Sequence, residues 1–287
     1  MEKHNRTVII TGGASGIGKS LAFHYGQKKY NVVLGDIEEP ALESTVNELR
    51  ADGINALGVT TDVSDLNSVQ SLSDASNAAF GPPTVVCLNA GVGAGGEIGQ
   101  IPMSDWEWVL SVNLWGVIHG LSVFLPTLQK QDVGHIVITS SIAGHLSYPR
   151  MGPYNASKHA VLTIAETLYF ELAEAQSNVG ISVLCPGLVR TQILNSERNR
   201  PETLMETPIA VSDKEQETRE AIVREIYDQA LDPSIVAELV YDAVEAKNFY
   251  IFTDDSFVDA LRQRHHNIEN AQNPNLRANL IEEHLND

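Results

Sequence analysis

The sequence predicts a doubly wound α/β fold, in which helices cover both faces of a single parallel sheet of about seven strands. Short runs of valine, isoleucine and leucine alternate along the chain with longer segments of helical pattern. The runs are almost continuously apolar, which is typical of strands that are buried on both faces. A regular alternation of strand and helix favours right-handed crossovers within a parallel sheet.

Seven apolar runs are strand candidates. Their length of four to six residues and their content of β-branched residues separate them from the longer helical segments. The candidates are Thr7–Thr11, Asn31–Asp36, Ala56–Thr61, Thr84–Asn89, His135–Ser140, Gly180–Cys185 and Phe249–Phe252.

The helical segments between these strands have recognisable starts. Serine or aspartate before a helix can cap its free N–H groups, and proline suits its first turn. The starts are marked by Pro40, by Ser104 with Glu107 ahead of a helix over 106–128, by Ser212 with Glu215, and by Asp232-Pro233 ahead of a helix that reaches Ala246.

The regular alternation breaks between Val189 and Asp232, where the chain is polar, and it ends after Asp254 in a tail rich in Asn, Gln and His. We therefore expect one catalytic domain over residues 1–253, with an insertion over 190–231 that covers the carboxyl edge of the sheet as a lid. Residues 254–287 are expected to form a C-terminal extension.

The 287-residue chain is strongly acidic, with a formal net charge of -18. Such a surface repels phosphate backbones and anionic lipid, which argues against nucleic acid and membrane surfaces as partners. It also means that an anionic cofactor must be held by local features. Cys87 and Cys185 lie in apolar runs and are interpreted as buried free thiols rather than a disulfide or a metal site. No signal peptide and no apolar stretch of about 18 residues is apparent, so we expect a cytoplasmic protein.

A glycine-rich loop follows the first strand and precedes a helix. Its glycines, Gly12, Gly16 and Gly18, allow a tight turn and a close approach of the backbone to a pyrophosphate, and the helix N-terminus adds free N–H groups. This strand–loop–helix context indicates a Rossmann-type dinucleotide site. Asp36, at the end of the second strand, can accept hydrogen bonds from the ribose hydroxyls and would repel a 2′-phosphate. Because Ile37 follows instead of a basic residue, NAD(H) is favoured and NADP(H) remains possible.

These motifs, with others in order along the chain, resemble the short-chain dehydrogenase/reductase family of the common single-domain type. The resemblance extends to about Thr191. It rests on Thr-Gly-x-x-x-Gly-x-Gly at 11–18, Asp62-Val63, Asn89-Ala90-Gly91, Asn113, Ser141, Tyr154-x-x-x-Lys158 and Pro186-Gly187 with Thr191.

The resemblance implies a cofactor site and an assembly. Asp62 and Val63 would border the adenine, and Pro186, Val189 and Thr191 would hold the nicotinamide carboxamide. Members of the family usually form homotetramers or homodimers, which we expect here as well. The full set of expected cofactor residues is Gly12, Ser15, Gly16, Ile17, Gly18, Asp36, Ile37, Asp62, Val63, Asn89, Ala90, Gly91, Tyr154, Lys158, Pro186, Gly187, Val189 and Thr191.

Tyr154 and Lys158 lie one helical turn apart and share a face. A neighbouring ammonium favours the phenolate, so we expect the pKa of Tyr154 to fall from its usual value of about 10 and the residue to act as acid and base. The Lys158 ammonium could also reach the nicotinamide ribose. The Ser141 hydroxyl could hydrogen-bond the reacting oxygen of the substrate. By the resemblance, Asn113 would hold a water that links Lys158 to solvent.

The expected substrate pocket is mostly apolar, and no basic side chain is obviously placed to bind an acid. This pattern favours a hydrophobic, bulky or aryl secondary alcohol and its ketone, with the lid excluding water. The segment Glu197–Glu202 resembles that of bacterial family members that act on aryl alcohols of lignin-type dimers. Candidate substrate contacts are Gly93, Ile142, Ala143, His145, Tyr148, Leu188 and Leu194.

Two other functions remain open from the sequence. The protein could bind NAD as a sensor or scaffold without turnover, although the set of Ser141, Tyr154 and Lys158 argues against a pure binder. It could catalyse an epimerase or dehydratase reaction, although the glycine spacing argues against that class. Taken singly, Ser141 and Asn113 could be a strand-end hydroxyl and a local turn cap.

Overall fold

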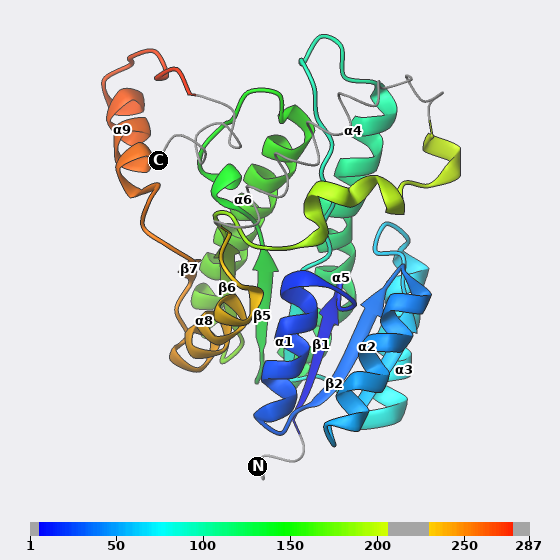
Figure 1. Cartoon of the computed structure of the whole chain (residues 1–287). Coiled ribbons are helices and arrows are strands. Elements are labelled where there is room, and N and C mark those ends of the chain that lie inside the picture. Colours follow the sequence, from blue (N-terminus) through cyan, green and yellow to red (C-terminus); the bar gives the residue numbers. More distant parts are fainter. Residues whose placement is uncertain (1–5, 206–229, 278–287) are drawn as a thin grey trace.

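The structure is a computed structural model that describes residues 6–205 and 230–277. Seven parallel strands form one sheet in the order β3-β2-β1-β4-β5-β6-β7 (Figure 1). This confirms the predicted doubly wound fold, because the strand order reverses direction between β1 and β4. The predicted Ser212/Glu215 helix start and residues 206–229 of the predicted lid lie outside the described residues.

The strands agree with the sequence prediction to within one residue at each end. Their buried valine, isoleucine and leucine side chains face helices on both sides of the sheet, which accounts for their continuous apolarity. The strands are β1 (Thr7–Thr11), β2 (Asn31–Asp36), β3 (Ala56–Thr60), β4 (Val85–Leu88), β5 (His135–Thr139), β6 (Gly180–Cys185) and β7 (Tyr250–Phe252).

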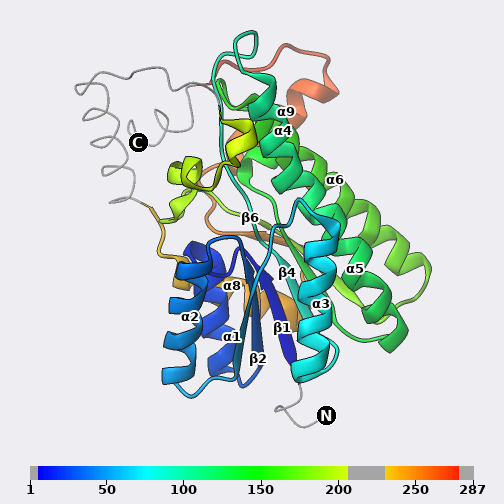
Figure 2. The same cartoon turned by 90° about the vertical axis from the view of Figure 1, so that its right-hand side faces the viewer.

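Helices cover the two faces of the sheet as separate layers, and Figure 2 shows the sheet between them. Each layer has its own hydrophobic cluster with the sheet. One layer holds α1 (Gly16–Gln27), α2 (Glu39–Ala51) and α8 (Pro233–Ala246), and the other holds α3 (Leu66–Phe80), α5 (Gly116–Gln131) and α6 (Gly152–Glu174). As predicted, the Asp232 side chain caps α8 by accepting a hydrogen bond from the Ser234 N–H.

A long helical run crosses the second layer. It consists of α4 (Met103–Leu110), a π-helical turn η2 (Ser111–Trp115) and α5. The run begins at Met103 with Pro102 as its cap residue, so Ser104 lies inside the first turn and the predicted capping box is wrong. The run also corrects our expectation about apolar stretches, because by length and composition alone it could cross a membrane, with a mean hydropathy of 1.6. Here it packs against α3 and α6.

The C-terminal extension contains α9 (Val258–Glu269), which lies above the carboxyl edge of the sheet beside α6 (Figure 1). Phe257 and Leu261 pack against Ile142 and Tyr148 in a small apolar cluster. The extension therefore packs against the loop that follows β5.

Candidate active site

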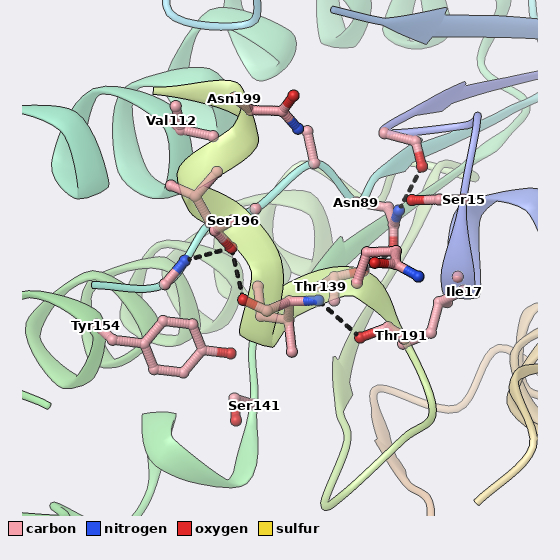
Figure 3. Close-up of a pocket in the computed structure, with 18 of the residues that line it drawn as sticks. Ser15, Ile17, Asn89, Val112, Thr139, Ser141, Tyr154, Thr191, Ser196 and Asn199 are labelled. Carbon is pink, nitrogen blue, oxygen red and sulfur yellow. Dashed lines mark hydrogen bonds between the residues drawn. The ribbon is translucent and has the colours of Figure 1, made fainter. Parts of the chain in front are cut away.

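The sheet carries a cavity of about 430 Å³ at its carboxyl edge, which is where ligands bind to open α/β sheets. The loops after β1, β2, β4, β5 and β6 contribute to its lining, and Figure 3 shows how their side chains converge. The cavity brings together all of the expected cofactor residues except Gly18. These are Gly12, Ser15, Gly16, Ile17, Asp36, Ile37, Asp62, Val63, Asn89, Ala90, Gly91, Tyr154, Lys158, Pro186, Gly187, Val189 and Thr191.

Gly18 does not line the cavity, but it packs directly against the glycine-rich loop at Gly12. A Cβ at this position would lie 2.0 Å from the Gly12 carbonyl oxygen, so a side chain would push the loop away from α1. The Asn89 side chain donates hydrogen bonds to the Thr11 and Gly12 carbonyls, and it accepts one from the Thr139 hydroxyl. These contacts join β1, β4 and β5 into a rigid floor, which fits the close approach of a pyrophosphate.

Two carboxylates mark the end of the cavity beside β2. The Asp36 carboxylate accepts hydrogen bonds from the Ala14 N–H at 2.8 Å and the Glu38 N–H at 3.0 Å. Burial nevertheless raises the pKa of Asp36, while these two N–H groups oppose the rise. Asp36 and Glu38 both line the cavity, and this acidic pair suits ribose hydroxyls better than a 2′-phosphate.

Of the four expected catalytic residues, Asn113, Ser141, Tyr154 and Lys158, the last three line one part of the cavity. Tyr154 and Lys158 project from α6, and Ser141 follows β5; Figure 3 shows Tyr154 and Ser141 beside each other. The buried Lys158 ammonium donates to the Thr139 carbonyl at 2.9 Å and lies 5.5 Å from the centre of the Tyr154 ring. Burial lowers the pKa of Lys158 to about 8.

The prediction that the pKa of Tyr154 falls is wrong. Burial of the ring raises that pKa, and a hydrogen bond with Ser141 opposes the rise only in part. The Lys158 ammonium does not offset the rise, because it is itself desolvated and directed to the Thr139 carbonyl. With these neighbours Tyr154 is protonated at neutral pH and suited to donate a proton.

Asn113 does not line the cavity. It lies in the π-helical turn η2, and its buried amide pairs with the backbone of Val92 in both directions: Oδ1 accepts from the N–H at 2.8 Å and Nδ2 donates to the carbonyl at 2.9 Å. Nδ2 also donates to the Ser157 hydroxyl on α6. Asn113 therefore fixes the loop after β4 to α6. Its expected role in holding a water stays a prediction.

The expected substrate residues separate into two groups. Gly93, Leu188 and Leu194 line the cavity. The other four do not, because the loop after β5 makes a 3₁₀ turn (η3, Ile142–Gly144) that carries its side chains away from the cavity. Ile142, Ala143 and Tyr148 pack in the apolar cluster under α9, and His145 lies with its Nε2 3.4 Å from the Cys185 sulfur. We therefore remove these four residues from the candidate substrate contacts.

The cavity is covered by the described part of the predicted lid, residues 190–205, which we call the lid segment. It contains two 3₁₀ turns, η4 (Gln192–Asn199) and η5 (Glu202–Leu204). The Ser196 hydroxyl accepts from the Gly93 N–H at 3.0 Å, a bond visible in Figure 3. The Arg198 guanidinium pairs with the Glu38 carboxylate at 2.7 Å, and the Asn199 side chain donates a hydrogen bond to the same carboxylate. Burial alone would raise the pKa of Glu38, but these two contacts hold it below its usual range.

The far end of the lid segment is anchored to α4. The Arg200 guanidinium contacts the Asp105 carboxylate at 2.8 Å and lies 4.3 Å from the centre of a ring of Trp108. Sequence reasoning placed a lid here but missed its anchoring residues, because the partners lie up to 161 positions away. It also missed Arg150 and Met151, which line the cavity.

The fold and this site define a dinucleotide-binding α/β protein. The family model of short chain dehydrogenases matches residues 6–202, and the chain belongs to this family of oxidoreductases. A solved short chain dehydrogenase/reductase from Burkholderia phymatum, in complex with NAD, is 41% identical and superposes with a TM-score of 0.90 over 96% of this chain and 99% of that one.

Two further relatives have narrower names. A C alpha-dehydrogenase from Sphingobium sp. is 32% identical over 86% of this chain and 80% of its own length. A CLA biosynthesis dehydrogenase/reductase from Lactiplantibacillus plantarum is 28% identical over 91% of this chain and 92% of its own length.

Proposed function

We propose that the protein interconverts a hydrophobic secondary alcohol and its ketone with NAD(H), and that Tyr154 is the acid and base. The observation that carries the proposal is the meeting of Ser141, Tyr154 and Lys158 in a cavity whose remaining walls are largely apolar. Apart from the expected cofactor residues, the apolar lining consists of Val92, Ala94, Trp108, Val112, Met151, Leu188, Ile193 and Leu194. Bulky, including aryl, side groups suit such a lining.

NAD(H) is the favoured cofactor because Asp36 and Glu38 place two carboxylates where the adenosine ribose is expected. Arg198 does line the same end, but it is paired with Glu38 and so is not free to receive a 2′-phosphate. The NAD complex of the Burkholderia relative supports the same choice. NADP(H) remains possible as a weaker cofactor.

In this mechanism Ser141, Tyr154 and Lys158 have separate roles. The Ser141 hydroxyl hydrogen-bonds the reacting oxygen and stabilises the charge that develops on it. Tyr154 gives its proton to that oxygen during ketone reduction. During oxidation Tyr154 first loses its proton to solvent, and the phenolate then takes the proton of the alcohol. Lys158, cationic below its pKa of about 8, keeps a positive charge beside the phenol and binds ribose hydroxyls. The nicotinamide supplies the hydride acceptor or donor.

The proposal is tested by following nicotinamide absorbance with NAD and NADP on aliphatic, aryl and steroid-like secondary alcohols. Tyr154→Phe removes the proton-transferring oxygen, and Tyr169→Phe on the same helix removes the same atom from an exposed ring. We expect turnover with NAD that Tyr154→Phe reduces by at least about 100-fold and Tyr169→Phe preserves.

Two results would overturn parts of the proposal. Equal activity in Tyr154→Phe and the wild type would exclude the tyrosine mechanism. Tight NADH binding in a fluorescence titration, without turnover on any alcohol or ketone, would favour the alternative of an NAD-binding sensor or scaffold.

A further inference from the structure

Arg150 is an unexplained cation at the candidate active site. Three cationic residues line the cavity in the described part of the chain, and the side chains of two of them already have partners: Lys158 donates to the Thr139 carbonyl, and Arg198 pairs with Glu38. Arg150 is exposed and has no carboxylate partner within residues 6–205 and 230–277. In a chain of net charge -18, a cation left unpaired at a cavity is notable.

The backbone at Arg150 is held in an unfavourable conformation. Its φ of 62° lies in the left-handed region, which non-glycine residues rarely adopt. The Arg150 carbonyl accepts a hydrogen bond from the Gly96 N–H at 2.9 Å, and a Cβ on Gly95 would lie 2.2 Å from the same oxygen. The loop after β4 thus fixes the loop after β5 in this conformation. Strain that the surroundings impose in this way is often found at ligand sites.

The position of Arg150 relates it to the substrate and not to the nucleotide. It precedes Tyr154 by one helical turn of sequence, and Met151 beside it also lines the cavity. The neighbouring rim is apolar: Ile98 is 72% exposed, and its Cγ1 lies 3.0 Å from where a Cβ of Gly152 would be. Asp36 and the glycines of the phosphate loop, where the adenosine and the pyrophosphate are expected, belong to the loops after β2 and β1 instead. Within the described residues, the entrance therefore combines an apolar surface with one guanidinium that has no carboxylate partner.

We propose that the substrate is an amphipathic acid, and that Arg150 binds its carboxylate while an apolar body carries the reacting hydroxyl or oxo carbon to Tyr154. The inference rests on the function proposed above. A guanidinium offers two parallel N–H donors to a carboxylate, and this geometry is stronger and more specific than a point charge. An acidic protein repels anionic substrates at long range, so a local cation is needed to bind one. Arg150 is thus proposed as a specificity-determining residue, at a position where the sequence indicated no basic side chain for an acid.

The test uses matched pairs of substrates. A series of aliphatic hydroxy acids of increasing length is compared with the methyl esters of the same acids, at saturating NAD. Arg150→Met keeps an apolar side chain of similar length without the charge, and Arg150→Lys restores the charge without the two parallel donors. Arg262→Met, on the exposed face of α9, is the control.

We expect the wild type to prefer acids over esters above a certain chain length. Arg150→Met should lower kcat/KM for these acids by about tenfold, mainly through KM, because a charged hydrogen bond is lost. The esters should react equally well in both proteins, and Arg150→Lys should recover part of the loss. The same order should hold for the affinity of the NADH-loaded protein for the acids, measured by calorimetry.

The inference is overturned if Arg150→Met affects acids and esters alike, or if the wild type prefers the ester at every length. In that case turnover of the esters would leave the proposed alcohol dehydrogenase function intact. If neither acids nor esters react while other secondary alcohols do, the inference is overturned and the proposed function stands. If no alcohol reacts at all, the proposed function fails, and calorimetry alone then decides whether Arg150 binds carboxylates.

Discussion

Ser196 anchors the lid segment to the loop after β4, and replacing it with alanine should speed the passage of cofactor. Its buried hydroxyl accepts from the Gly93 N–H at 3.0 Å and donates to the Ile193 carbonyl at 2.6 Å. The Ser196→Ala change leaves both groups without this partner. Because the surroundings are only partly buried, we expect a cost of about 1–2 kcal/mol, which corresponds to a factor of about five to thirty.

The position of the lid segment determines which quantity changes. The segment follows β6 and reaches Glu38 after β2, so it crosses the ends of β5, β4 and β1 and covers the groove where the nucleotide is expected. We therefore expect NADH to enter and leave only when the lid segment opens. In Ser196→Ala, the rates of NADH association and dissociation should both rise by about the same five- to thirtyfold factor. The Kd for NADH should change less, because the Ser196 contacts favour the closed lid segment equally in the free and the bound protein.

The assay is stopped-flow displacement of NADH by excess NAD, followed by nicotinamide fluorescence. Asp105→Asn weakens the second anchor of the lid segment, at Arg200, and should accelerate dissociation as well. Ser71→Ala, which removes a hydroxyl from the exposed face of α3, is the control. Dissociation rates that stay at the wild-type value in both anchor variants would refute the reasoning, since NADH would then leave without opening the lid.

Two further predictions concern charge. Asp36→Asn should lower the ratio of kcat/KM with NAD to that with NADP by about tenfold, because one of two carboxylates beside the ribose is neutralised while Glu38 remains; an unchanged ratio in steady-state assays would contradict this role. Burial lowers the pKa of His135 to about 4, so between its unfolded pKa of about 6.5 and that value the unfolded state binds the extra proton and stability is lost as the pH falls. By about pH 5.5 the free energy of unfolding should have fallen by about 1 kcal/mol on this account. Urea unfolding at about pH 7.5 and about pH 5.5 should show this fall in the wild type and in His265→Gln, the control at an exposed site. His135→Gln should lack it.

The sheet and the nucleotide loop could be predicted from the sequence because their signals are local. A strand buried on both faces must be apolar throughout, and β1, β2 and β6 match their predicted bounds without change. The glycines of the phosphate loop follow from backbone geometry that involves only a few residues. Tyr154 and Lys158 were also accessible, because a separation of four positions on a helix places two side chains on one face.

The features that were missed depend on contacts between distant segments. Asn113, in the π-helical turn, pairs with the backbone of Val92, and the turn that directs Ile142 away from the cavity is packed under α9, more than a hundred positions later. The conformation of Arg150 is imposed by the Gly95-Gly96 segment of another loop. The pKa of Tyr154 was misjudged for the same reason, because spacing along a helix does not report how strongly a side chain is desolvated.

The charges that line the cavity differ between its two ends, and this difference connects the cofactor proposal with the substrate proposal. Asp36 and Glu38 make the end beside β2 anionic, although Arg198 neutralises Glu38 in part. The other end holds the cations of Lys158 and Arg150. A carboxylate substrate would be repelled from the adenosine end and attracted to the end that contains Tyr154, so one arrangement of charges would both disfavour a 2′-phosphate and orient an acid for reaction. Replacing Arg150 should therefore affect acids alone, whereas replacing Asp36 should affect cofactor choice and leave the preference for acids over esters unchanged.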